Sequence, residues 1–520
     1  NVTTQLIVNY AKKFAGKHDI NLRAGYENYY EYIEELGADR DGYVLTNFPY
    51  LNNGPKDLIG NSGKGKEYAY RSYFGRVMYS YADRYLFQAN IRHDGSSRFA
   101  KKHRWGTFPS FSAGWVLSEE NFMKNLNWEW LSFLKIRATW GALGNERIGD
   151  FPYMSTIAFG NTIFYQNNGI YFDQTASQQK YAIENVTWEK TESTDIGLDI
   201  SFLNNRLRVN GDYYWKNTKD MLLAMAIPDF LGFSDPDVNA GKMSTKGYEL
   251  NVSWNDHIGD FSYGIAINFS DFTSKMGDLQ GTQFLGDKVK MEGSEFNEWY
   301  GYVSDGLFLT EEDLKNSPKI NDKNTQLGDI KYKDISGPDG VPDGKISPEY
   351  DRVLLGSSLP HFLYGGNINL GYKNFDLSLA FQGVGKQNAR LAREMVEPFR
   401  NNYGNFPAII DGNYWSPYNT DEQNAVAKYP RLTHVNKSSN YAMSDYWLFN
   451  GGYFRLKNIT LGYTFPKEWM NAIGIKGARI YASASDLFCL SKYPKGWDPE
   501  MGVSEYPITT SILLGVSVNF

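Results

Sequence analysis

The chain has 520 residues, which is enough for several ordinary domains or for one very large barrel. Aromatic residues make up 16% of it but all hydrophobic residues only 42%, as in a transmembrane β-barrel, where half of each strand faces water and rings gather at both interfaces. The net charge of -6 argues against a nucleic-acid partner, the single Cys489 excludes an intramolecular disulfide and a cysteine-based zinc site, and no run approaches the ~20 apolar residues of a membrane-spanning helix.

Strand-like segments alternate apolar and polar residues and come in pairs that short polar turns join. Residues 5–14 and 20–30 are joined through 16–19, and a second pair follows at 70–93. The polar segment 31–67 is expected to be an external loop, because outer-membrane barrels have tight turns at one end and long loops at the other. In total the pattern predicts about 15 strands: 5–14, 20–30, 70–80, 85–93, 108–117, 133–141, 192–202, 206–215, 247–255, 260–269, 362–372, 375–382, 453–465, 479–488 and 511–520.

The last predicted strand ends on an aromatic residue. Val516, Val518 and Phe520 fall on one face of it, while small or polar residues fall on the other. A strand of a soluble sandwich would alternate in the same way. In a membrane barrel these three residues would face lipid, and the strand would pair with the first one to close the cylinder.

Two long polar interruptions, 145–189 and 276–360, are expected to be functional extracellular loops. Within the second, Thr310 precedes three acidic residues, which predicts an N-capped helix and hence a folded loop. Trp299, Tyr300 and Tyr302 lie ahead of this helix. Sugar rings stack on such side chains, so all three are candidate substrate contacts.

A further polar segment contributes two more candidate substrate contacts, Trp415 and Tyr418. A role in maintaining the fold is an equally open interpretation of this tryptophan motif.

The acidic segment 334–351 is a candidate calcium loop. Counted from Asp339, it places Asp343 at the fifth position and a glycine at the sixth, as in an EF-hand loop, but valine and tyrosine stand at the third and twelfth. Ser347 and Asp351 complete the candidate ligand set. A solvated cluster of Asp and Gly turns is the alternative interpretation.

Catalytic constellations are absent from the sequence. The six histidines have no metal-ligand spacing, and no nucleophile elbow or phosphate-binding glycine loop occurs. Asp498 and Glu500 have the residue types of a glycosidase pair, but a structural role is favoured. The chain is therefore expected not to be an enzyme.

Six motifs, taken in order, resemble those of the SusC/RagA-like TonB-dependent transporters of the Gram-negative outer membrane. They are HDGSSRF with GTFPS (93–110), LKIRATWG through GN (134–145), WEKT (188–191), NAGKM with KGYE (239–249), FRLKNITLGY (454–463) and GWDPE (496–500). One departure is Asp486, where the family usually has asparagine.

The resemblance implies a plug followed by a 22-stranded barrel, of which 1–520 would be the C-terminal portion, without the plug and first strands. It implies active nutrient import, a SusD-like surface lipoprotein, TonB acting through the plug, and a dimer of transporter and lipoprotein pairs. An oligosaccharide is the expected cargo and a peptide the main alternative. Two rival functions stay open: a soluble aromatic-rich β-protein acting on polysaccharide, and a passive porin.

Overall fold

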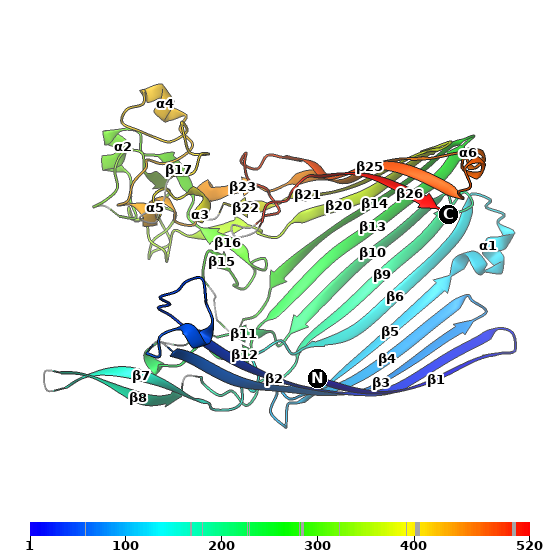
Figure 1. The fold of residues 1–520 in the computed structure, drawn as a ribbon, viewed down its shortest axis with the longest axis horizontal. Coiled ribbons are helices and arrows are strands. Elements are labelled where there is room, and N and C mark those ends of the chain that lie inside the picture. The colour runs from blue at the N-terminus through cyan, green and yellow to red at the C-terminus, as the bar shows by residue number, and fades with distance from the viewer. Residues whose placement is uncertain are drawn as a thin grey trace. The chain divides into compact units, whose positions relative to one another are not determined.

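The computed structural model describes residues 1–57, 59–166, 169–178, 180–225, 227, 229–279, 281, 285–321, 323–391, 393–400, 406–501 and 506–520. Its main feature is a 15-stranded antiparallel sheet (Figure 1), whose strands match the predicted segments one for one. In sheet order they are β1 (Val2–Phe14), β2 (His18–Arg40), β3 (Ile59–Tyr81), β4 (Tyr85–Ser96), β5 (Trp105–Val116), β6 (Leu131–Asn145), β9 (Glu189–Phe202), β10 (Leu207–Lys219), β13 (Lys242–Ile258), β14 (Phe261–Met276), β20 (His361–Tyr372), β21 (Phe375–Lys386), β24 (Tyr453–Thr464), β25 (Gly477–Ser491) and β26 (Ser511–Asn519).

The chain divides into two compact units, which are described separately. The first unit comprises Asn1–Glu120, Ile136–Ile196 and Lys216–Lys242. The second comprises Asn121–Lys135, Gly197–Trp215 and Met243–Phe520.

In the first unit, tight turns join β1 to β2 and β3 to β4. Ala15 and Gly16 have φ of 49° and 66°, and Ala82 and Asp83 have φ of 54° and 55°. Phe14 pairs with His18 and Tyr81 pairs with Tyr85, so each turn spans three residues, two of which have the left-handed backbone that tight hairpin turns use. The predicted hairpins are therefore confirmed.

The prediction of a loop at 31–67 is wrong for the two flanks of that segment, which are strand, and 41–57 lies outside the strands. β2 continues to Arg40 and β3 begins at Ile59, with these two residues paired in register. Strand pairing uses backbone groups, so it continues where the side chains of both faces are mostly polar. Lys64 and Glu35 illustrate this, because they form an exposed ion pair with Nζ 2.9 Å from Oε2.

The two faces of the sheet differ in polarity, as the alternation predicts. In β4, Phe87 and Ile91 are 46% and 53% exposed, and Gln88 and Arg92 lie on the opposite face. Rows of exposed large apolar side chains are costly in water but suit hydrocarbon. The apolar face is thus the one that meets a lipid phase, and the polar face is the one that meets water.

The loop ends of the first unit have a small core of Phe99, Phe108, Val186 and Trp188. Trp188 packs edge-on against Phe108, with ring centroids 5.3 Å apart, and its Nε1 donates to the carbonyl of Arg104 at 2.9 Å. The segment 145–189 carries its own hairpin, and a two-stranded ribbon lies near the core. These elements are β7 (Ile157–Gln166), β8 (Gly169–Gln178), β11 (Leu222–Ala224) and β12 (Asp237–Asn239), with 3-10 turns η1 (Leu51–Asn53) and η3 (Asp229–Leu231). A further 3-10 turn, η2 (Leu117–Glu119), follows β5 at the turn end of the strands.

The loops of the second unit form a larger core around Trp447, Tyr332 and Leu391. The predicted capped helix is confirmed as α2, because the Thr310 Oγ1 accepts a hydrogen bond from the Asp313 N–H at 3.1 Å. The elements of these loops are β15 (Lys288–Val289), β16 (Glu298–Gly301), β17 (Ser304–Leu307), α2 (Glu311–Asn316), β18 (Ile330–Tyr332), β19 (Val353–Gly356), β22 (Asn388–Arg390), α3 (Arg393–Val396), α4 (Asp421–Ala425), α5 (Lys437–Asn440), η4 (Asp445–Trp447) and β23 (Leu448–Asn450).

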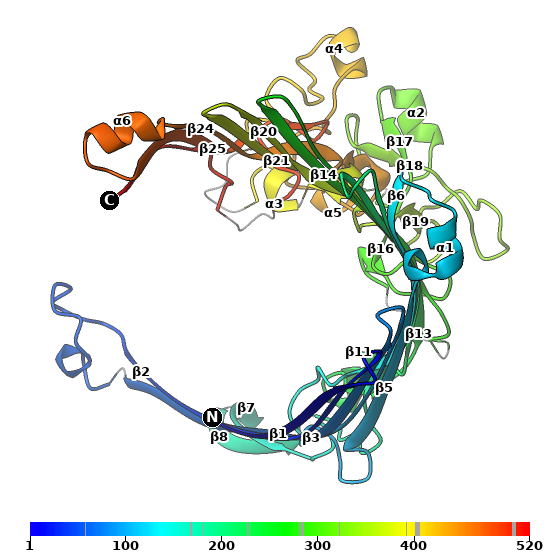
Figure 2. The same ribbon diagram turned by 90° about the vertical axis from the view of Figure 1, so that its right-hand side faces the viewer.

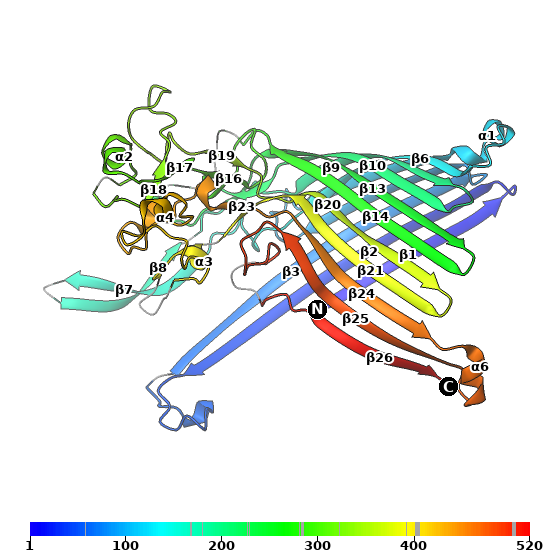
Figure 3. The same ribbon diagram turned by 90° about the horizontal axis from the view of Figure 1, so that it is seen from above.

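At the opposite ends of the second unit's strands lie tight turns and two short helices, α1 (Asn121–Asn125) and α6 (Lys467–Ala472). α6 connects β24 to β25 and contacts β25 (Figure 2). β20, β21, β24, β25 and β26 run side by side (Figure 3). Within the described residues, none of the helices combines the length and the apolarity that a membrane crossing requires.

Candidate functional site

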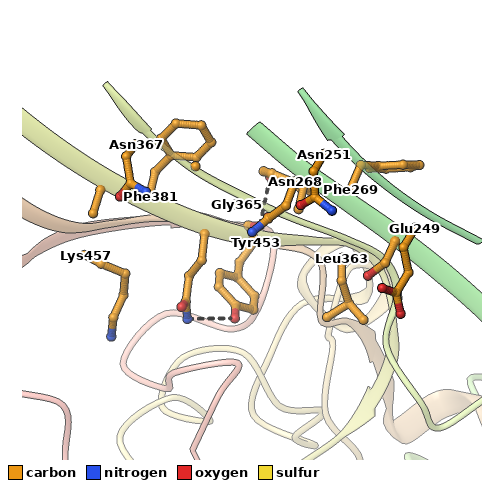
Figure 4. Close-up of a pocket in the computed structure, with 16 residues that line it drawn as sticks. Glu249, Asn251, Asn268, Phe269, Leu363, Gly365, Asn367, Phe381, Tyr453 and Lys457 are labelled. Carbon is orange, nitrogen blue, oxygen red and sulfur yellow. Dashed lines mark hydrogen bonds between the residues drawn. The ribbon is translucent and has the colours of Figure 1, made fainter. Parts of the chain in front are cut away.

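A polar hollow of about 670 Å³ lies on the second unit, where five consecutive strands contribute to its lining. Figure 4 shows Glu249, Tyr453 and Lys457 on one side of the sheet and the rings of Phe269 and Phe381 on the other. The lining residues are Glu249, Asn251, Asn268, Phe269, Ser270, Leu363, Tyr364, Gly365, Gly366, Asn367, Ala380, Phe381, Gln382, Gly383, Tyr453 and Lys457.

Register brings the carboxamides of the hollow together. Asn251 pairs with Asn268, and Asn268 pairs with Gly365. Directly paired residues project from the same face, with Cβ atoms about 5 Å apart. A Cβ at Gly365 would come within 3.0 Å of the Asn268 Oδ1. The glycine thus leaves room for the amide beside it.

One wall of the hollow is held by charged groups. The Gln382 Nε2 donates to the Glu500 Oε1 at 2.9 Å. Arg455, only 3% exposed, donates from Nε to the same oxygen at 3.1 Å and from Nη2 to both oxygens of Asp498 at 2.6 Å. Asp498 and Glu500 therefore bind an arginine on a neighbouring strand, which accords with the structural role favoured for them.

Lys457 brings a positive charge to the hollow, and its Nζ lies 2.6 Å from the Asp486 Oδ1. Asp486 has a left-handed backbone with φ of 49°. Asparagine and aspartate both tolerate this conformation. Aspartate at this position therefore fits the left-handed backbone and forms an ion pair with Lys457.

The three predicted substrate contacts ahead of α2 are packed into the loops. Lys288 Nζ lies 4.6 Å from the centroid of the Trp299 ring, and the Trp299 Nε1 donates to the Asn388 carbonyl at 2.6 Å. The Arg352 guanidinium lies 4.5 Å from the centroid of the Tyr300 ring. Tyr302 is 6% exposed and belongs to the loop core.

The other two predicted contacts differ from one another. Trp415 packs against the loop core and over Gly328, where a Cβ would lie 2.3 Å from the indole. Gly328 has φ of +81°, so this position needs glycine for both reasons. Tyr418 is 96% exposed and presents its ring to solvent. Of the five predicted contacts, it is therefore the one most open to a ligand.

In the acidic loop, Asp351 is fully buried and binds backbone N–H groups from both ends of the loop. Its oxygens accept hydrogen bonds from the Ile335 N–H at 2.8 Å and the Ser347 N–H at 2.7 Å. Asp343 Oδ1 accepts from the Lys345 N–H at 3.0 Å, and Asp339 is exposed. Across the described part of the chain, no three His, Cys, Asp or Glu side chains gather as a metal site. Calcium binding by this loop stays a prediction.

The predicted closure residues lie on the last strand. Val516 pairs with Ile480, and Val518 pairs with Ala478. Val516, Val518 and Phe520 are exposed to 69%, 40% and 83%. They belong to the exposed apolar face, and closure of a cylinder through this strand stays a prediction.

The sequence did not predict the carboxamide hollow, because the predicted substrate contacts are aromatic residues in loops. Its signal lies in the alternation, because Asn251, Asn268 and Asn367 all occupy water-facing positions of adjacent hairpins. Such positions are normal in a barrel wall, so the residue types alone do not mark a hollow.

Comparisons with known proteins agree on the class of this fold. Residues 3–487 match the family model described as TonB dependent receptor-like, beta-barrel. The chain is 31% identical to TonB-dependent receptor P3 of Formosa agariphila, over 96% of the chain and 49% of that protein. It is also 31% identical to TonB-dependent receptor SusC of Bacteroides thetaiotaomicron, over 100% of the chain and 50% of that protein.

The fold is also that of one chain in a solved structure, the RagAB peptide transporter, with a TM-score of 0.81 and 22% identity over 100% of this chain and 55% of that chain. The chain spans about half the length of the curated relatives it matches. Its place in the outer membrane contradicts the alternative of a soluble β-protein. The chain belongs to the family of TonB-dependent receptor-like β-barrels of the outer membrane.

Proposed function

We propose that residues 1–520 form the barrel portion of a TonB-dependent, SusC-like transporter that imports an oligosaccharide across the outer membrane. The observation that carries the choice of cargo is the hollow beside Asn251, Asn268, Asn367 and Gln382. Each carboxamide offers both donors and an acceptor. Sugar hydroxyls offer the same, so a neutral, amide-lined wall suits a chain of sugars.

A peptide is the second candidate cargo. The hollow also presents the carboxylate of Glu249 and the ammonium of Lys457. The N-terminal ammonium of a peptide is complementary to the first, and its C-terminal carboxylate is complementary to the second. Carboxamides also pair with peptide N–H and C=O groups. The likeness to the RagAB peptide transporter, at 22% identity, is one of fold.

The proposed transporter works with a SusD-like surface lipoprotein and with TonB, which acts through a plug, as a dimer of transporter and lipoprotein pairs. The hairpin of β7 and β8 supports a protein partner at the loop end. Phe159 and Phe172, on one face of that hairpin, are 83% and 75% exposed. Large apolar areas of this kind mark interaction surfaces.

The test replaces the central carboxamides. In the intact protein, Asn251→Ala with Asn268→Ala removes hydrogen-bonding groups from the hollow and is expected to weaken cargo affinity about tenfold, since about 1.4 kcal/mol corresponds to that factor. Asn369→Ala is the matched control, because Asn369 lies on the same strand and face as Asn367 but outside the hollow. Isothermal titration against oligosaccharide and peptide panels, with uptake in cells, gives both readouts.

Three results would contradict parts of the proposal. Equal affinity of the double variant and the control would remove the hollow from the cargo path. Binding of peptides alone would replace the oligosaccharide with the second candidate. Uptake that persists without TonB would favour the passive porin.

A further inference from the structure

An apolar groove of about 540 Å³ lies on the first unit, away from the carboxamide hollow. Its side-chain lining comes from the exposed apolar face of five neighbouring strands, β1 to β5. The lining residues that shape it are Ala24, Gly75, Val77, Ala89, Ile91 and Phe111.

The register of the strands creates the groove. Ala24 pairs with Gly75, and Gly75 pairs with Ile91. In the adjacent row, Val77 pairs with Ala89, and Ala89 pairs with Phe111. Two alanines and a glycine thus form a low floor between larger side chains.

Two clusters of aromatic rings lie on either side of the groove along the strands. On the loop side, Trp105 stacks with His93 and Tyr73, with centroids 4.8 and 6.1 Å apart. On the turn side, Tyr81 stacks with Tyr85 at 6.3 Å. Aromatic girdles mark the two membrane interfaces of a barrel, so the groove lies at the level of hydrocarbon.

A cation lies just beyond the loop-side girdle on the same face. Arg71 is four residues from Gly75 along β3, which is about 13 Å of strand. It is exposed, and its Nε donates to the Asn28 Oδ1 at 3.2 Å. The loop end of a barrel strand is the extracellular end, so this charge lies at the level of the outer leaflet's headgroups.

We propose that this surface binds one acylated, phosphorylated glycolipid of the outer leaflet, with an acyl chain in the groove and a phosphate at Arg71. The groove is part of the lipid-facing wall. If it were empty, the side chains that line it would lose dispersion contacts. An acyl chain that moves from the bilayer into the groove gains no hydrophobic free energy, because both environments are apolar. Packing in the groove and the contact of the phosphate with Arg71 therefore hold the lipid in place. The proposal rests on the membrane position of the barrel and is independent of the cargo.

The test fills the groove without disturbing the fold. A Cβ at Gly75 would lie 3.8 Å from both the Ile91 Cγ2 and the Arg23 carbonyl oxygen, which is ordinary contact, so the position has room for a Cβ, and Gly75→Val adds two further carbons at the floor of the groove. Gly211→Val is the matched control. Its Cβ would lie 3.9 Å from the Leu250 Cδ1, on the apolar face of the second unit and outside the groove.

The intact protein and its variants are purified in mild detergent from their own outer membrane. Bound endogenous glycolipid is counted by native mass spectrometry, and folding is checked by thermal unfolding. We expect about one glycolipid per chain in the parent and in Gly211→Val, with at least a tenfold loss of bound lipid in folded Gly75→Val and in Arg71→Gln. Equal retention in all four proteins would overturn the site. Retention of a phospholipid in place of the glycolipid, or an unchanged Arg71→Gln, would overturn the assignment of the ligand.

Discussion

Arg431 holds the buried carboxylate of Asp329 at two points, with Nε 2.7 Å from Oδ1 and Nη2 3.2 Å from Oδ2. Asn436 and Asn440 donate to the same carboxylate from their Nδ2 atoms at 2.8 and 2.9 Å. Asp329 is 1% exposed. These contacts join two loop segments that are far apart in the sequence, so one carboxylate organises the loop core of the second unit.

Asp329→Ala is expected to destabilise that loop core by about 3–5 kcal/mol, because it leaves a guanidinium and two amides without their acceptor. The measurement is limited proteolysis of the loops, with thermal unfolding of the intact protein. Glu35→Ala is the control, because Glu35 pairs with Lys64 at the surface and its removal should cost about 0–1 kcal/mol. Equal resistance to proteolysis in both variants would contradict the role of Asp329.

Arg455→Leu is expected to destabilise the wall of the hollow, because Asp498 and Glu500 lose the buried cation that holds them. The cost should be about 3–5 kcal/mol, and it should appear as a lower unfolding temperature. Arg479→Leu removes a more exposed ion pair, with side-chain exposures of 33% and 45% for Arg479 and Asp376, and should cost less. The reverse order of the two variants would argue against the buried pair.

Among the predicted substrate contacts, Tyr418 and Tyr302 are expected to have different roles, one in ligand binding and the other in folding. Tyr418→Ala removes a side chain that is 96% exposed, so it should lower cargo affinity without changing the unfolding temperature. Tyr302→Ala removes a side chain of the loop core and should cost about 3–5 kcal/mol of stability. Affinity for the cargo and thermal unfolding are measured on both. Unchanged affinity in Tyr418→Ala would remove Tyr418 from the candidate site.

The loop core should weaken at alkaline pH. Burial raises the pKa of Tyr332 and Tyr441 well above the usual value of 10.0, and burial, with a smaller contribution from Asp498, raises the pKa of Tyr493 to about 12. Because the folded pKa values exceed the unfolded ones, this stability is fully present below pH 10 and is lost as the pH rises from about 10 towards 12. Tyrosinate absorbance and proteolysis of the loops, followed together across this window, check the prediction.

Tyr332→Phe is the control for the alkaline transition. It removes one ionisable group and the hydrogen bond from the Tyr332 hydroxyl to the Ser439 carbonyl at 2.7 Å. The variant should start less stable near neutral pH and lose less stability above pH 10. A loss as steep as in the parent protein would assign the transition to other groups.

Several motifs behind the family resemblance turn out to be structural contacts. Phe99 and Phe108 from the motif at 93–110 and Trp188 from the motif at 188–191 meet in one core. Asn239, from the motif at 239–249, accepts from the Thr187 N–H at 2.7 Å and donates to the Thr187 carbonyl at 2.9 Å. The motifs are recognisable without these contacts, because each is specific in its residue types and in its order along the chain.

The sequence by itself determined the class of fold, the number of strands and the face that each strand turns to lipid. That is because a two-residue period is a local property, and half-buried strands need it at every step. It also determined the cap at Thr310, which depends on neighbouring residues only.

Only the tertiary structure decided where β2 ends and β3 begins, which aromatic rings are buried and where the hollow lies. The β2–β3 ladder extends as far as the pair of Arg40 with Ile59 through backbone groups, which carry no residue-specific signal. The burial of Tyr302 depends on loops that are distant in the sequence. The grouping of Asn251, Asn268 and Gly365 depends on register, which is set between strands rather than within any one of them.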